Sequence, residues 1–197
     1  MSAGHPPDTP ASVILIGGPS GVGKSRLAHA LARRTASTVA QVDDLQTAIE
    51  TLVPSERLPE YHVPATTYLR TRSPEEIARA IEQLAVFFSP GVRGVIENRL
   101  ESGTPTVLEG DFIAPEVAAE ARSVGVRSLF LLGTEDEIQA NFLQRDGDEQ
   151  VGRAAVSAMV SRRLAERCGE LGLPSTSGRP FTSLLSRAVG MLGLPSL

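Results

Sequence analysis

Eight residues near the start of the chain have the types and spacing that phosphate binding requires. They read Gly18-Pro19-Ser20-Gly21-Val22-Gly23-Lys24-Ser25 and fit the pattern G-x-x-x-x-G-K-[ST]. Glycines let the backbone curl so that successive N–H groups point inward, and the helix that follows adds positive potential at its start. In this pattern the Lys24 ammonium reaches the β- and γ-phosphates and the Ser25 hydroxyl reaches Mg²⁺. The stretch therefore predicts a nucleotide-phosphate site.

The composition gives Lys24 extra weight. The chain has 197 residues, with 19 lysines and arginines against 23 aspartates and glutamates, so the net charge is −4. Lys24 is the single lysine, and every other basic residue is arginine. A lysine used once is better explained by chemistry than by surface solubility. The negative net charge also argues against a nucleic-acid partner, because dedicated nucleic-acid binders carry a basic surface.

Two acidic stretches are the next candidates. Asp43-Asp44 precedes a helix expected from residue 45 to 52, so one carboxylate could simply cap that helix. Alternatively, one of them polarises a substrate hydroxyl or enters the Mg²⁺ shell. Glu109-Gly110-Asp111 ends an apolar run, where Glu109 could hold Mg²⁺ through water. The simpler alternative is a polar strand end that caps the helix expected at Pro115.

The hydrophobic pattern predicts a scaffold that brings these residues together. Short buried strands are expected at 13–16, 38–42, 106–110 and 126–132, and helices at 24–35, 45–52, 74–88, 92–101, 115–123, 135–145, 151–170 and 181–192. This alternation is typical of an α/β fold, a parallel sheet with helices on both faces. Ligands bind beyond the carboxyl ends of such strands. Because the glycine loop and both acidic stretches follow strands there, they should converge on one cleft.

Other segments are candidates for the walls of that cleft. Arg145 and Arg153 flank a charged, glycine-containing loop at 146–152, which suits a mobile lid. Their planar guanidinium groups suit phosphate oxygens, although many helical arginines are merely solvated. Residues 53–105 are too long for a simple connection and are predicted to cap an acceptor site. Within them, His62 and Tyr68 could line a substrate pocket.

The chain is expected to form one domain over residues 12–197 behind a disordered tail at 1–11. Cys168 is the single cysteine, so neither an intramolecular disulfide nor a Cys/His zinc site is expected. Apolar runs are too short for a signal sequence or a membrane span, which predicts a cytoplasmic protein without a membrane partner. The oligomeric state is left open.

Together the motifs resemble the 2-phosphoglycerate kinase group and, more broadly, P-loop small-molecule kinases such as chloramphenicol phosphotransferase and zeta-toxin-type kinases. The resemblance covers about residues 12–153 and rests on the glycine loop, the Asp-Asp pair, Val107-Leu108-Glu109-Gly110 followed by Ile113-Ala114-Pro115, and Asn141-Phe142-Leu143-Gln144-Arg145. It implies a three-layer P-loop sandwich with about five parallel strands, ATP and Mg²⁺ as cofactors, and a lid beginning at Arg145. It also implies that Asp44 acts on the acceptor hydroxyl.

The sequence departs from that family at the acceptor. Thr47 stands where those kinases commonly carry arginine, and Asp111-Phe112 stands where they carry an apolar residue and histidine. A phosphorylated acceptor needs cationic partners, so these departures argue against 2-phosphoglycerate itself. A neutral or cationic hydroxylated acceptor fits better.

The predicted function is transfer of the ATP γ-phosphate to a hydroxyl of a small metabolite or antibiotic-like molecule. The predicted catalytic residues are Lys24, Asp44 and Arg145, and Arg26 and Arg153 join the glycine loop in binding ATP. Mg²⁺ is assigned to Ser25, Asp43 and Glu109, and the acceptor to Asp43, Glu109, Asp111, His62 and Tyr68. One alternative is a nucleotide-binding switch or regulatory ATPase. The other is a polynucleotide or nucleoside kinase, against which the net charge and Thr47 both argue.

Overall fold

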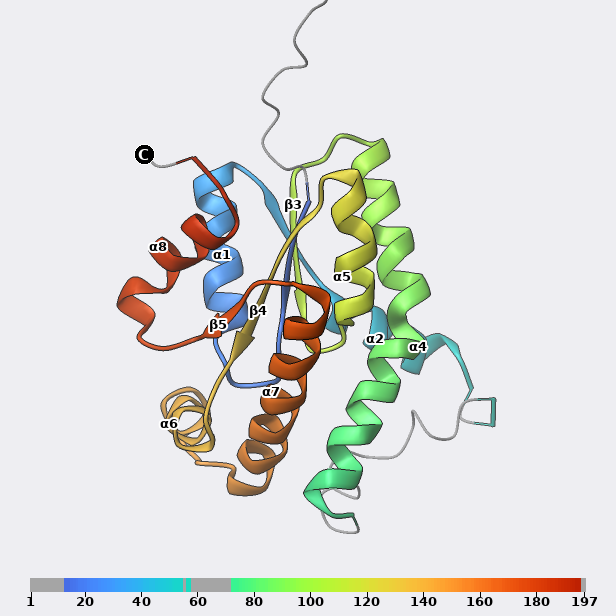
Figure 1. Cartoon of the computed structure of the whole chain (residues 1–197). Helices are drawn as coiled ribbons and strands as arrows, with labels where there is room; N and C mark the ends of the chain where they lie inside the picture. Colours follow the sequence, from blue (N-terminus) through green and yellow to red (C-terminus); the bar gives the residue numbers. More distant parts are fainter. Residues whose placement is uncertain (1–12, 55, 58–71, 196–197) are drawn as a thin grey trace, which may run out of the picture.

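Five parallel strands form a single sheet in the order β2-β3-β1-β4-β5 (Figure 1). The computed structural model describes residues 13–54, 56–57 and 72–195. The strands are β1 (Val13–Gly17), β2 (Thr38–Gln41), β3 (Thr106–Gly110), β4 (Arg127–Leu132) and β5 (Ser175–Ser177). β1 lies in the centre, with Ile16 paired to Glu109 of β3 on one side and to Leu129 of β4 on the other. The predicted α/β fold with a parallel sheet is confirmed.

Helices cover both faces of the sheet. They are α1 (Lys24–Thr35), α2 (Val42–Leu52), α4 (Pro74–Glu101), α5 (Pro115–Ala121), α6 (Glu135–Asp146), α7 (Val151–Leu171) and α8 (Phe181–Met191), with a short 3₁₀ turn at Arg122–Val124. α1 and α8 lie on one side of the sheet, and α4, α5 and α7 lie on the other (Figure 1). This is the three-layer arrangement that the sequence predicted.

The alternation of side chains along β1 explains why both faces must be covered. Ile14 and Ile16 enter the core under α1 and α8, whereas Val13 and Leu15 enter the core under α4 and α5. All five residues of β1 are buried. A strand that is apolar on both faces is stable only between two layers of helices.

The interval expected to hold two helices is one helix. α4 runs unbroken from Pro74 to Glu101 and contains Pro90 in its interior. Pro90 is exposed, and so is Val86, whose carbonyl loses its amide partner. Phe88 and Val92 on either side are buried in the same core cluster. Packing of this apolar stripe therefore outweighs the helix-breaking tendency of proline.

One further boundary and one further strand differ from the prediction. β2 ends at Gln41 and α2 begins at Val42, three residues earlier than expected. β5 was not predicted, because its three residues, Ser175–Ser177, carry no apolar signal. The remaining helices and strands lie within a few residues of their predicted bounds. In the described part of the chain, no helix is both long and apolar enough to span a bilayer.

Candidate active site

The glycine loop joins β1 to α1 at the carboxyl edge of the sheet. Gly23 caps α1 with φ 96°, a left-handed conformation that a residue with a side chain rarely adopts. A β-carbon there would also lie 2.7 Å from the Phe181 ring, so both the backbone conformation and the close approach of Phe181 favour glycine. Val22 is buried beneath the loop and, like Gly18 and Pro19, shapes it from below without lining the cleft.

A cleft of about 390 Å³ opens over this loop. It collects residues from five separate stretches of the chain: Ser20, Gly21, Gly23, Lys24, Ser25, Arg26, Gln41, Asp43, Glu109, Asp111, Asn141, Gln144, Arg145 and Phe181. The predicted convergence of the glycine loop with both acidic stretches is therefore observed. His62 and Tyr68 lie outside the described residues.

The Lys24 ammonium is held by groups of the cleft. It donates to the Pro19 carbonyl at 2.9 Å and forms an ion pair with Asp111 Oδ1 at 2.5 Å. Lys24 is 7% exposed and Asp111 is 26% exposed, so the pair is largely withdrawn from water. The Lys24 ammonium, which a nucleotide phosphate would contact, is thus paired with the Asp111 carboxylate.

Asp43, and not Asp44, lines the cleft. Asp43 lies in the first turn of α2, which approaches β3 closely because Gly110 has no side chain: a β-carbon there would lie 2.7 Å from Val42 Cβ. Neither aspartate caps the helix, since the N-cap residue is Gln41. The capping alternative for this pair is therefore wrong. The other capping alternative is also wrong, because the N-cap of α5 is Ala114.

The pKa of the Asp43 carboxyl is raised to about 6. The main cause is loss of hydration between the cleft walls, although solvent still reaches the residue through the open mouth. Repulsion from Asp111 and Glu109 raises the pKa further, while the Lys24 ammonium and the Asp111 backbone N–H lower it. A carboxyl group with a pKa close to neutrality is suited to accept a proton.

The cleft contains donors that suit Mg²⁺ only together with phosphate oxygens. Glu109 is 4% exposed and lines the cleft, and its carboxylate forms no hydrogen bond or ion pair with another described residue. Ser25 is exposed at the same cleft. Among residues 13–54, 56–57 and 72–195, no three acidic, histidine or cysteine side chains are grouped to hold a metal. A hydroxyl and one or two carboxylates fit Mg²⁺ that is otherwise bound by phosphates and water.

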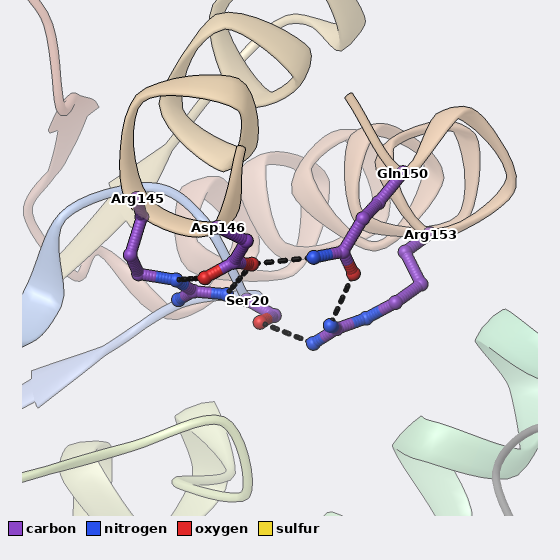
Figure 2. A network of polar contacts seen from close by, with 5 residues as sticks. All are labelled: Ser20, Arg145, Asp146, Gln150 and Arg153. Atoms are coloured by element: carbon purple, nitrogen blue, oxygen red, sulfur yellow. Dashed lines mark hydrogen bonds and ion pairs between the residues drawn. The ribbon is translucent and has the colours of Figure 1, made fainter. Parts of the chain in front are cut away.

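Arg145 and Arg153 meet the glycine loop through the polar network drawn in Figure 2. Arg153 donates to Ser20 Oγ at 3.2 Å and also contacts Gln150. Arg145 lines the cleft and donates two hydrogen bonds to Asp146, at 2.7 and 2.8 Å. Gln150 links the two halves through a hydrogen bond to Asp146 (Figure 2). The structure therefore brings both predicted arginines to the loop, with Arg145 paired to a carboxylate.

The part of the cleft lining near α8 was not predicted from the sequence. The guanidinium groups of Arg26 and Arg179 both lie over the Phe181 ring, 4.6 and 4.4 Å from its centroid. A second hollow continues from the cleft at this point and is lined by Arg26, Glu137, Gln144, Arg179, Pro180, Phe181 and Thr182. Asn141 donates to the Gly21 carbonyl at 2.7 Å and contacts Arg179. Asn141 and Gln144 belong to a motif quoted above, but Phe181 and Arg179 gave no signal beyond a helix start.

Comparison with curated proteins finds relatives named 2-phosphoglycerate kinase. The protein of Thermococcus kodakarensis is 26% identical over 184 residues, which cover 88% of this chain and 63% of the relative. The protein of Methanothermobacter thermautotrophicus is 34% identical over 110 residues, which cover 52% of this chain and 36% of the relative. The chain thus spans less than two thirds of the length of these relatives. No family model matches the chain.

Among solved structures, a gluconokinase from Sinorhizobium meliloti has a similar fold. The TM-score is 0.55 at 19% identity, over 94% of this chain and 93% of the gluconokinase. At this identity the likeness shows a shared fold. Together with the curated relatives, it confirms the resemblance to P-loop small-molecule kinases that the motifs indicated.

Proposed function

We propose that the protein transfers the γ-phosphate of ATP to a hydroxyl group of a small molecule. The observation that carries the proposal is the meeting of a phosphate-binding loop and the Asp43 carboxyl in one cleft. A loop of this kind positions the phosphates, and a carboxylate beside it can take the proton of an attacking hydroxyl. The similarity to proteins named as kinases supports the same activity.

The residues divide into a donor wall and an acceptor wall. The donor wall consists of the glycine loop with Lys24, together with Arg26, Arg145 and Arg153 near it. Its backbone N–H groups and cations would hold the phosphates and balance the charge that develops on them. The hollow beside Phe181 is lined by planar guanidinium and amide groups of Arg26, Arg179 and Gln144, which suit the nucleobase.

The acceptor wall consists of Asp43, in the first turn of α2, and of Glu109 and Asp111 at the carboxyl end of β3. The acceptor oxygen would bond to the γ-phosphorus, the bond to the bridging oxygen of ADP would break, and the hydroxyl proton would pass to Asp43. Ser25 and Glu109 would hold Mg²⁺, which when bound neutralises phosphate charge. We therefore assign the base to Asp43, which lines the cleft, in place of Asp44, which was predicted from the sequence.

A screen for mass gain tests the proposal. The purified protein is incubated with ATP, Mg²⁺ and sets of sugars, hydroxy acids, amino sugars and nucleosides, and products are read by mass spectrometry. The proposal expects one acceptor class to gain a single phosphoryl group, with one ADP formed for each. ATP hydrolysis to inorganic phosphate across all sets, with no phosphorylated acceptor, would favour the switch-ATPase alternative and overturn the proposal.

A further inference from the structure

The charges of the cleft are sorted by wall. The cations Lys24, Arg26 and Arg145 come from α1 and α6. Of the carboxylates, Asp43 comes from the first turn of α2, and Glu109 and Asp111 come from the end of β3. Among the described residues of the cleft, the 2.5 Å contact between Lys24 and Asp111 is the one ion pair that joins the two walls. Within the acceptor wall, defined above as Asp43, Glu109 and Asp111, Asp111 is therefore the carboxylate that pairs directly with a donor-wall cation.

Glu109 adds an independent sign of a missing partner. Its side chain is 4% exposed, lines the cleft, and has no hydrogen-bond or ion-pair partner among the described residues. A carboxylate that faces the cleft from a mostly buried side chain is placed to meet a cation or a donor that arrives with a ligand. Mg²⁺ bound with ATP can supply that charge for Glu109. Because Ser25 and Glu109 would hold that ion with the phosphates, it would not replace Lys24 as the partner of Asp111.

Nucleotide binding would remove the ion-pair partner of Asp111, because its other cationic neighbour, Arg145, is already hydrogen-bonded to Asp146. In the proposed function the Lys24 ammonium turns to the β- and γ-phosphates, which outcompete one carboxylate by charge. Asp111 is then a partly buried anion facing the place of the acceptor. A phosphorylated or carboxylate acceptor would set like charges together there, whereas a cationic acceptor would replace Lys24.

We infer that the acceptor carries a cationic nitrogen near the hydroxyl that is phosphorylated, and that Asp111 is the residue that selects it. This inference rests on the proposed function and narrows its substrate class to amino sugars, aminocyclitols and similar amino alcohols. The acceptor oxygen bonds to the γ-phosphorus, ADP leaves with the electron pair of the broken bond, and the hydroxyl proton passes to Asp43. The ammonium group keeps its charge throughout and serves only in recognition.

Matched acceptors test the inference. Amino sugars and aminocyclitols are each paired with their N-acetyl derivatives, which keep the hydroxyl groups and lose the charge, and gluconate and 2-phosphoglycerate represent anionic acceptors. For the wild type, kcat/KM is expected to be at least about tenfold higher for the amine than for its N-acetyl partner, as one charged hydrogen bond would give. Transfer to the anionic acceptors is expected to be undetectable.

Three variants assign the effect to Asp111. Asp111→Asn should bring the two members of each pair within about threefold, and Asp111→Glu should retain the preference for the amine. Glu101→Gln, which removes an exposed carboxylate at the end of α4 away from the cleft, should behave as wild type. Thermal unfolding of each variant verifies that the protein is folded.

The outcomes separate the inference from the proposed function. Transfer to N-acetyl or anionic acceptors at rates equal to those of the amines overturns the inference and leaves the kinase activity standing. An unchanged amine preference in a folded Asp111→Asn variant overturns the role of Asp111. Absence of transfer to every acceptor overturns the proposed function and the inference with it.

Discussion

The donor wall and the acceptor wall of the cleft are built in different ways. The donor wall is centred on eight consecutive residues, Gly18 to Ser25, whose conformation is set by local backbone geometry and by the helix that follows. The acceptor wall is assembled from Asp43 and from Glu109 to Asp111, which are more than sixty residues apart and meet only because β2 and β3 are neighbours. A local sequence motif is therefore enough to locate the donor wall, whereas the position of the acceptor wall depends on how the chain folds.

Removing the cation of the donor wall should have the largest effect. Lys24→Ala is expected to reduce phosphoryl transfer about a thousandfold, since it removes the ammonium that we propose meets the phosphates. It should also lower the Tm, because Asp111 loses its ion-pair partner in a site that is 26% exposed. Steady-state kinetics and thermal unfolding measure the two effects.

A double variant separates them. Lys24→Ala combined with Asp111→Asn removes the unpaired carboxylate, so the Tm should recover while phosphoryl transfer stays about a thousandfold below wild type. Wild-type transfer by the single variant would refute the assignment of the donor wall.

Protonation of Asp43 should have the next largest effect on phosphoryl transfer. Since the pKa of Asp43 is raised to about 6, kcat/KM should fall tenfold per pH unit below that value as the base becomes protonated. The sign for stability is opposite. The folded state holds this proton more tightly than the unfolded state, so stability is lost as the pH rises from about 4 to about 6.

Asp43→Asn should remove that part of the stability decline, which urea unfolding at pH 4 and pH 8 measures, with Asp44→Asn as the matched control. A profile of transfer that stays flat down to pH 4.5 would show that Asp43 is not the base.

Separating the two parts of the acceptor wall, α2 and β3, should have a moderate effect. Gly110→Ala sets a β-carbon 2.7 Å from Val42 Cβ and so pushes the start of α2, with Asp43, away from β3. We expect a loss of about 1–3 kcal/mol in the free energy of unfolding and a larger loss in kcat than in ATP affinity.

The control is Gly94→Ala on α4, where a β-carbon meets nothing within 4 Å. That variant should gain about 0.5–1 kcal/mol from helix propensity and keep full activity. Equal behaviour of the two glycine variants would contradict the close approach of α2 and β3.

The smallest effect concerns Arg145. Asp146→Asn removes the partner that accepts its two hydrogen bonds, so Arg145 becomes freer to reach phosphate. Because the pair is solvent-exposed, the KM for ATP should fall by no more than about fivefold. Glu149→Gln, which changes an exposed carboxylate of the same loop, should leave KM unchanged. A rise in KM for the Asp146 variant would mean that the carboxylate orients Arg145 productively.

What could be predicted from the sequence follows the same division. The glycine loop, the parallel sheet and the convergence of the acidic stretches follow from local patterns and from the geometry of α/β folds. The choice between Asp43 and Asp44 could not, because it depends on whether α2 begins at residue 42 or at residue 45. Propensities do not define helix starts that finely.

Elements placed by distant packing were also beyond prediction. The continuity of α4 through Pro90 depends on the core that Phe88 and Val92 enter. Phe181 and Arg179 reach the cleft because β5 adds to the edge of the sheet, and β5 has no apolar pattern of its own. Tertiary contacts decided both, and local propensity gave no sign of them.

The most direct test compares single-turnover transfer by Asp43→Asn and Asp44→Asn at pH 8, with ATP binding measured for both. If Asp43 is the base, Asp43→Asn should lower the transfer rate at least about a hundredfold while binding ATP normally, and Asp44→Asn should stay within about threefold of the wild-type rate. The reverse order, or full transfer by the Asp43 variant, would contradict it.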